Sequence, residues 1–284
     1  MRLKLAITCI SFLLLLTSCQ KVKHHKAQDA SAKPDLVEGR YNVAFLVMDG
    51  VYNTELTAPY DIFQHTQYRD GIKAMNVFTV ANTLDPIRTF EGLRLLPDYN
   101  YLVDDVPQID ILVVPSAEHH LDTDLDDEDM IDWVRQVGTD AQYITSHCDG
   151  AFVLAQAGLL DDVASTTFPS DVDKYRQMFP DLAVVEDVLF VHDGRAITSA
   201  GGARSFEAAL YLCDLLYGPK IARSIAGGLV IDWNVDQVNY YNPALGKSNG
   251  STEKFDLYSD SQDVDDSTDE ESKYSQFHRA IITM

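Results

Sequence analysis

The chain is short of basic residues and of cysteine. It has 22 lysines and arginines against 44 acidic residues, a formal net charge of −22 at pH 7. A surface of that charge repels phosphate backbones and anionic lipid headgroups, which argues against nucleic acid as a partner. Four cysteines in 284 residues are too few for a disulfide-stapled scaffold. Hydrophobic residues make up 46% of the chain, which is ample material for a globular core.

Motifs for common cofactors and metals are also missing. No Gly-x-Gly-x-x-Gly follows an expected strand, and no cysteine–histidine cluster has metal-ligand spacing. The acidic stretch at residues 122–132 lacks the glycine of a calcium loop, so a capped helix with a solvated face explains it better. We therefore expect neither a bound cofactor nor a metal.

The longest apolar run is too short to span a bilayer. Residues 5–16 are apolar, about a dozen positions where a membrane helix needs roughly 20. Arg2 and Lys4 precede the run, and small residues lead from it to Cys19, an order that resembles a bacterial lipobox. We expect a signal peptide at residues 1–18, a lipid on Cys19 and a tether over residues 19–40, which would anchor the protein in the cell envelope. An ordinary secretory signal is the alternative.

The acidic C-terminal region sets the other boundary of the expected domain. Residues 234–284 contain a dense acidic run with glycines and serines, a composition typical of a disordered tail. A folded domain is therefore expected over residues 41–233. Within it lie Cys148 and Cys213, enough for one disulfide, although the apolar helical run around Cys213 indicates a core position.

Apolar segments in the middle of the chain alternate between strand and helix patterns. Such alternation predicts a mostly parallel sheet covered by helices on both faces. Ligands of such sheets bind beyond the carboxyl ends of the strands. The expected strands are 41–47, 74–81, 109–114, 141–145, 163–166, 188–192 and 196–199, with a hairpin at 88–96 and helices at 54–67, 126–137, 150–160 and 205–217.

The segment around Cys148 is the sharpest local signal. An apolar strand ends there, a Cys-x-Gly turn follows, and a helix begins at once. This order predicts a nucleophile elbow, in which the turn lifts the sulfur above the sheet. Free N–H groups at the helix start would favour the thiolate. A small buried cysteine in an ordinary strand–helix turn is the alternative.

Four segments in order resemble the DJ-1/PfpI superfamily. They are residues 49–61 (DGVYNTELTAPYD), 146–160 (SHCDGAFVLAQAGLL), 166–169 (TTFP) and 197–210 (ITSAGGARSFEAAL). The similarity spans about residues 41–233. It implies a three-layer α/β/α sandwich with a mostly parallel, flavodoxin-like sheet, and a homodimer.

The resemblance assigns roles to several positions. Cys148 would be the reactive thiol, and Glu55 the acidic residue beside it that donates a hydrogen bond or moves a proton. The backbone N–H groups of Ala117 and Asp149 would match the oxyanion donors. A solvated glutamate on a helix is the alternative for Glu55.

The chain departs from the family pattern at three positions. PfpI-type proteases have histidine directly after the cysteine, where this chain has Asp149. Many DJ-1-like members have histidine at the place of Phe168 and arginine at the place of Ala200. These departures weaken a protease or deglycase assignment and leave proton transfer to Glu55 or to an unmatched group.

Two further histidines are candidates for that unmatched group. His119 and His120 follow the strand that ends at residue 114, so either one is placed to line a pocket with Phe168 and to shuttle a proton, or to hold a metal with Glu118. A solvated loop is the alternative that we favour for the histidine pair.

The sequence thus predicts cysteine-dependent hydrolase or hydratase chemistry on a small electrophilic molecule. Isonitrile hydration, hydrolysis of a small amide and aldehyde scavenging all fit. The alternative is a non-catalytic ligand- or oxidation-sensing module, because the resemblance extends to the sensor domains of AraC-like regulators. In those regulators a DNA-binding helix-turn-helix follows the domain, whereas an acidic stretch follows it here. A passive lipoprotein that has lost the chemistry is the third possibility.

Overall fold

The structure, a computed structural model, describes residues 33–248. These residues form a central sheet with helices on both faces. Its strands run in the order β13-β12-β10-β11-β7-β6-β1-β2-β5. Their bounds are β1 Tyr41–Leu46, β2 Met75–Ala81, β5 Tyr99–Asn100, β6 Ile111–Val114, β7 Tyr143–His147, β10 Phe190–Asp193, β11 Ala196–Ser199, β12 Tyr240–Asn242 and β13 Lys247–Ser248.

Most neighbouring strands in this sheet are parallel, and β10–β11 and β12–β13 are the antiparallel pairs. The helices are α2 Asn53–Gln64, α3 Glu128–Asp140, α4 Gly150–Gln156, α5 Val172–Met178, α6 Ser205–Tyr217 and α7 Pro219–Gly228. Short 3-10 turns are η1 His65–Tyr68, η2 Thr123–Asp126, η3 Pro169–Asp171, η4 Gly202–Arg204, η5 Val235–Gln237 and η6 Pro243–Leu245.

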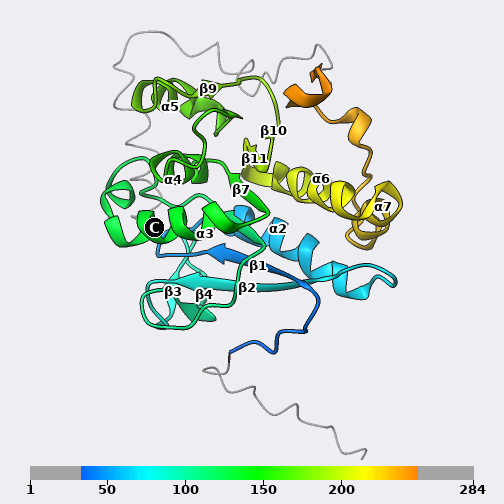
Figure 1. The fold of residues 1–284 in the computed structure, drawn as a ribbon, viewed down its shortest axis with the longest axis horizontal. Coiled ribbons are helices and arrows are strands. Elements are labelled where there is room, and N and C mark those ends of the chain that lie inside the picture. The colour runs from blue at the N-terminus through cyan, green and yellow to red at the C-terminus, as the bar shows by residue number, and fades with distance from the viewer. Residues whose placement is uncertain (1–32, 249–284) are drawn as a thin grey trace, which may run out of the picture.

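Alternate residues of β1 show why the sheet is covered on both faces. Val43 and Phe45 pack in one core cluster with residues of α2, α6 and α7. Ala44 and Leu46 face the opposite cluster, which contains residues of α3, α4 and α5. Residues 43–46 of β1 are apolar on both faces, so this part of the strand must be buried on both sides. The structure therefore has three layers, α/β/α, as predicted (Figure 1).

The sheet continues past the boundary that the sequence suggests at residue 233. β12 pairs in parallel with β10, with Phe190 opposite Tyr240, and their rings stack with centroids 4.9 Å apart. Aromatic packing thus orders a segment whose composition resembles a tail. The rest of the acidic region, like residues 1–32 with Cys19, lies outside the described residues.

Smaller elements account for most remaining differences from the sequence prediction. The strand expected at 163–166 is β8 Ala164–Ser165, which pairs with β9 Ala183–Val184 in a separate sheet. The expected hairpin is β3 Ile87–Arg88 with β4 Arg94–Leu95. Helices α5 and α7 were not expected. Within residues 33–248, no helix combines the length and apolar character needed to cross a bilayer.

Candidate active site

Cys148 lies on a strained turn at the carboxyl edge of the sheet. It follows β7 directly and precedes α4, and its φ is +53°, a left-handed value that is rare outside glycine. Its N–H donates to the Ser199 carbonyl at the end of β11 (2.9 Å). A Cβ on Gly150 would stand 2.0 Å from the Val114 carbonyl oxygen, so glycine is required where the turn approaches β6. The local geometry is that of a nucleophile elbow.

Glu55 forms hydrogen bonds to three separate segments around the thiol. It lies in the first turn of α2 and is 5% exposed. Its Oε2 accepts from the Ser116 N–H (3.2 Å), and its Oε1 accepts from the Gly202 N–H (3.0 Å). The Cys148 thiol is a third hydrogen-bond partner. Burial raises the pKa of Glu55, although these hydrogen bonds act in the opposite direction.

Asp149 places a second carboxyl against the same sulfur. Its Oδ2 accepts from Cys148 Sγ at 3.5 Å. Its Oδ1 is 3.1 Å from Thr167 Oγ1, which also lies 3.2 Å from the Cys148 carbonyl oxygen. The side chain is largely buried, and burial, with the negative charge of Asp171 as the next cause, raises the pKa of Asp149 to about 7. Sequence reasoning had assigned only the backbone of this residue.

The surroundings of the sulfur are acidic and contain little that stabilises a thiolate. Burial raises the pKa of Cys148 well above its usual value, and the charges of Glu55 and Asp149 add to this. The Ser116 hydroxyl and the Asp149 N–H lower it, but Ser116 Oγ makes no hydrogen bond of ordinary geometry. The Asp149 N–H at the helix start thus favours the thiolate as expected, but burial and the two carboxylates outweigh it, so the net pKa of the thiol is raised.

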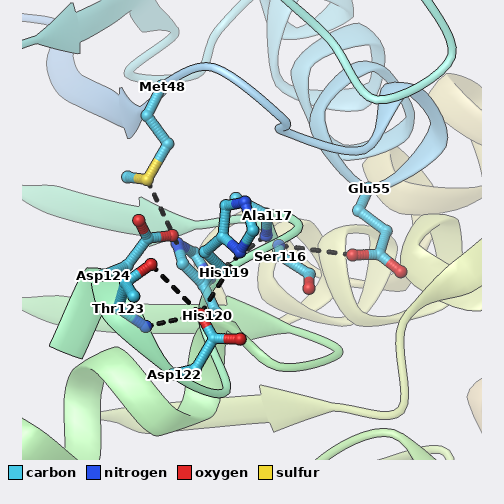
Figure 2. A network of polar contacts seen from close by, with 9 residues as sticks. All are labelled: Met48, Glu55, Ser116, Ala117, His119, His120, Asp122, Thr123 and Asp124. Atoms are coloured by element: carbon cyan, nitrogen blue, oxygen red, sulfur yellow. Dashed lines mark hydrogen bonds and ion pairs between the residues drawn. The ribbon is translucent and has the colours of Figure 1, made fainter.

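The solvated-loop interpretation of the 119–120 pair is wrong for His120, which is buried, whereas His119 is exposed (Figure 2). His120 is buried; its Nδ1 accepts from the Ala117 N–H (3.2 Å), and its Nε2 faces Met48 Sδ (3.4 Å). Burial lowers its pKa to about 3, so the ring is neutral at physiological pH. His119 is exposed and pairs with Asp122 at 3.2 Å.

Other contacts concern the predicted oxyanion donors and the neighbouring His147. The Ala117 N–H already has His120 as its acceptor, whereas the Asp149 N–H bonds the sulfur. His147, next to Cys148, is buried against Ser199 Oγ (2.9 Å) and points away from the chemistry. No group of side chains within residues 33–248 has the arrangement of a metal site.

An apolar pocket of about 360 Å³ adjoins the thiol. The pocket is lined by Thr167, Gly201 and Gly202, which connect it to the site. Thr167 hydrogen-bonds the Cys148 carbonyl, Gly201 packs against Cys148 and Gly202 donates to Glu55. Cys148 and Glu55 themselves are not part of the pocket wall. Phe168 and Ala200, two of the departures from the family pattern, line this pocket, whereas His119 and His120 do not. Its wall includes the apolar residues Phe168, Pro169, Val172, Val188, Leu189 and Ala200, and the charged residues Glu186, Asp187 and Arg204 also line it. An apolar group bound there would lie beside the nucleophile.

The structure adds site residues that sequence reasoning missed. They are Tyr52, Ser116, Thr167 and the side chain of Asp149. Burial and the nearby acidic groups, Cys148 first, raise the pKa of Tyr52. Ser116 and Thr167 each follow the end of a strand, which is the signal that could have found them. Cys213 is fully buried and, like Cys148, is a free thiol, so the predicted core position holds and the two form no disulfide.

Comparison with known proteins identifies the family. The sequence profile of the DJ-1/PfpI family matches residues 41–214. The chain belongs to this family. An isonitrile hydratase of Pseudomonas putida is 30% identical over 185 residues, which cover 64% of this chain and 75% of that protein.

Two further similar proteins give the range of the likeness. An HTH-type transcriptional regulator of Pseudomonas aeruginosa, CdhR, is 32% identical over 102 residues, 36% of this chain and 30% of the regulator. The crystal structure of a THiJ/PfpI family protein from Pseudomonas syringae superposes with a TM-score of 0.61 at 24% identity, covering 72% of this chain and 83% of that one. This structural likeness supports the fold.

Proposed function

We propose that this DJ-1/PfpI protein is a cysteine-dependent hydratase of a small, uncharged electrophile, with an isonitrile as the first substrate class to test. The observation that carries the proposal is a thiol on a strained turn, held between two buried carboxyls beside an apolar pocket. The relative named isonitrile hydratase, at 30% identity, supports the choice of substrate class.

The reaction needs a nucleophile and a group that carries one proton. Cys148 Sγ bonds to the terminal carbon of R–N≡C, and the thiol proton passes through a carboxylate to that carbon, giving the thioimidate R–N=CH–S–Cys. Water then adds to the carbon, and its second proton moves to nitrogen. The C–S bond breaks, the thiol regains a proton, and R–NH–CHO leaves. One water is consumed, and nothing is oxidised or reduced.

The pocket supports an uncharged substrate with an apolar substituent. Its volume of about 360 Å³ is within the usual range for small-molecule sites. The acidic groups around the sulfur would repel an anion. An isonitrile has no net charge, and its substituent is free to occupy the apolar wall.

The test is turnover of cyclohexyl isonitrile by the full-length protein, with formation of N-cyclohexylformamide followed by NMR. Wild type is expected to form the formamide, and Cys148→Ala to lose at least 100-fold in rate. Cys213→Ala is the matched control, because that thiol lies in the core, and it should keep wild-type turnover. No formamide from wild type, or equal rates in wild type and Cys148→Ala, would refute the proposal.

A sensing module is the second candidate, and the match to a transcriptional regulator favours it, whereas the raised pKa of the Cys148 thiol acts against rapid oxidation. Sensing predicts that hydrogen peroxide modifies Cys148 selectively, as sulfenic acid or a further oxidation product, while isonitriles, small amides and aldehydes are left unchanged. Peptide mass spectrometry after peroxide treatment distinguishes the two, since the Cys213 peptide serves as the internal reference. Equal oxidation of both thiols would argue against sensing.

Attachment to a bacterial envelope through lipid on Cys19 is part of the proposal and depends on residues 1–19 alone. In a bacterial host, the full chain should partition into the detergent phase with a mass increase at Cys19. Cys19→Ala should remain in the aqueous phase. An unmodified Cys19 in wild type would refute the anchor.

A further inference from the structure

The two carboxyls beside Cys148 differ in what else they bind. Both oxygens of Glu55 accept backbone N–H groups, from Ser116 and Gly202. Those donors favour the charged form and fix the orientation of the carboxylate, so that adding a proton there would disrupt a hydrogen bond. Glu55 is suited to hold three loops together.

Asp149 has no such anchors. It stands at the N-cap of α4, yet its side chain does not cap the helix. Its partners are Cys148 Sγ, at 3.5 Å from Oδ2, and the Thr167 hydroxyl, at 3.1 Å from Oδ1. Hydroxyls and thiols reorient when a carboxyl gains a proton, because each is both donor and acceptor. Thr167 also lines the pocket, so a single hydrogen bond connects this carboxyl to the pocket wall.

We infer that the Asp149 carboxylate is the general base that takes the proton from Cys148 Sγ and the general acid that returns it, with Glu55 as the residue that positions the loops. The inference deepens the proposed function, because it names the proton carrier at that site. In the hydratase cycle, Oδ2 accepts the thiol proton as the C–S bond forms and then delivers it to the former isonitrile carbon.

The charges that face Asp149 come from several elements. Glu55 from α2 and Asp171 from η3 are negative neighbours, and the Cys148 sulfur is the third. Tyr52, just before α2, also interacts with Asp149. Burial and this negative field keep the carboxyl able to exchange a proton near neutral pH, which is what an acid–base group needs.

The test is the rate of Cys148 alkylation by iodoacetamide from pH 5 to 9 in the full-length protein, followed on the Cys148 peptide by mass spectrometry. General-base assistance predicts that Asp149→Asn lowers the rate at pH 8 by about tenfold or more and removes an inflection near pH 7. A residue that only repels the thiolate predicts the opposite, since removing its charge lowers the thiol pKa and speeds alkylation. Faster alkylation, or an unchanged inflection, would overturn the inference.

Two further variants keep the test decisive if Asp149→Asn does not fold. Thr167→Val removes a donor to the carboxylate and should move the inflection to higher pH, whereas Asp171→Asn removes a negative neighbour and should move it to lower pH. Asp173→Asn is the matched control, because its side chain is fully exposed on α5 and the profile should not change. Shifts of the same sign in Thr167→Val and Asp171→Asn would overturn the inference.

Because alkylation needs no substrate, it tests the role of Asp149 independently of the proposed substrate class. Wild type that hydrates no isonitrile but shows the Asp149-dependent profile refutes only the substrate class. Wild type that hydrates isonitriles while Asp149→Asn keeps full turnover and the wild-type profile refutes only the proton carrier.

Discussion

Adding one methyl group at Gly201 should damage both stability and reactivity. Gly201 follows β11 and has φ +79° and ψ −150°, a conformation that is essentially restricted to glycine. A Cβ there would stand 2.4 Å from Cys148 Cβ and 2.6 Å from its backbone nitrogen. Ordinary contacts between such atoms are about 3.5–4.0 Å, so the elbow must move by roughly 1 Å.

The expected loss follows from two effects. Backbone strain of this kind costs about 1–3 kcal/mol, and forced overpacking typically costs another 1–3 kcal/mol. Gly201→Ala should therefore lower the free energy of unfolding by about 2–6 kcal/mol. The displacement also acts on the neighbouring Gly202 N–H that binds Glu55, so alkylation of Cys148 should change as well.

Urea unfolding followed by circular dichroism measures the first effect, and Gly194→Ala is the matched control. Gly194 also has a left-handed φ, +59°, but a Cβ there would meet nothing within 4 Å. It should lose only the left-handed backbone cost, about 1–2 kcal/mol. If Gly201→Ala loses no more than Gly194→Ala, the close approach to Cys148 does not constrain the site, and the reasoning is wrong.

Three further predictions concern the site and its surroundings. Folding raises the Asp149 pKa from 3.8 to about 7, so the folded state binds this proton more tightly than the unfolded state. The resulting contribution to the free energy of unfolding is full below about pH 4 and is lost as the pH rises to about 7. Asp149→Asn should remove this pH-dependent loss of stability, which is at most about 4 kcal/mol, in denaturation measured from pH 4 to 8. Parallel curves of stability against pH for variant and wild type would contradict the prediction. His120→Ala should lower the free energy of unfolding by about 2–4 kcal/mol, because it leaves a cavity and an unpaired Ala117 N–H. In the same urea assay, His119→Ala should change it by no more than about 0.5 kcal/mol, because His119 is exposed. Equal losses in the two variants would show that burial does not decide the effect. Phe168→Ala should raise KM severalfold for an isonitrile with a bulky apolar substituent and leave the KM of a methyl-substituted one nearly unchanged, since Phe168 lines the pocket. Equal effects on both substrates in steady-state kinetics would show that the substituent does not bind in this pocket.

The layers of the fold were predictable because apolar patterning is a local property. Residues 43–46 of β1 and all of β6 are apolar on both faces, which only a sheet covered on both sides can bury. The elbow was predictable for the same reason, since strand, turn and helix are consecutive along the chain at Cys148. The alternation did not reveal that β12 joins the sheet, because its pairing with β10 depends on aromatic contacts between Phe190 and Tyr240.

The sequence by itself thus determined which residue types stand at the ends of the strands, with Cys148 on a tight turn and Glu55 at the start of a helix. Only the tertiary structure decided their chemistry. The pKa of a buried carboxyl depends on burial and on groups brought in from distant segments. Asp149 receives negative charge from Asp171 and Glu55 and a hydrogen bond from Thr167. Those contacts join residues far apart along the chain, so no local pattern specifies them, and the residue that sequence reasoning treated as a missing histidine becomes the second carboxyl of the site.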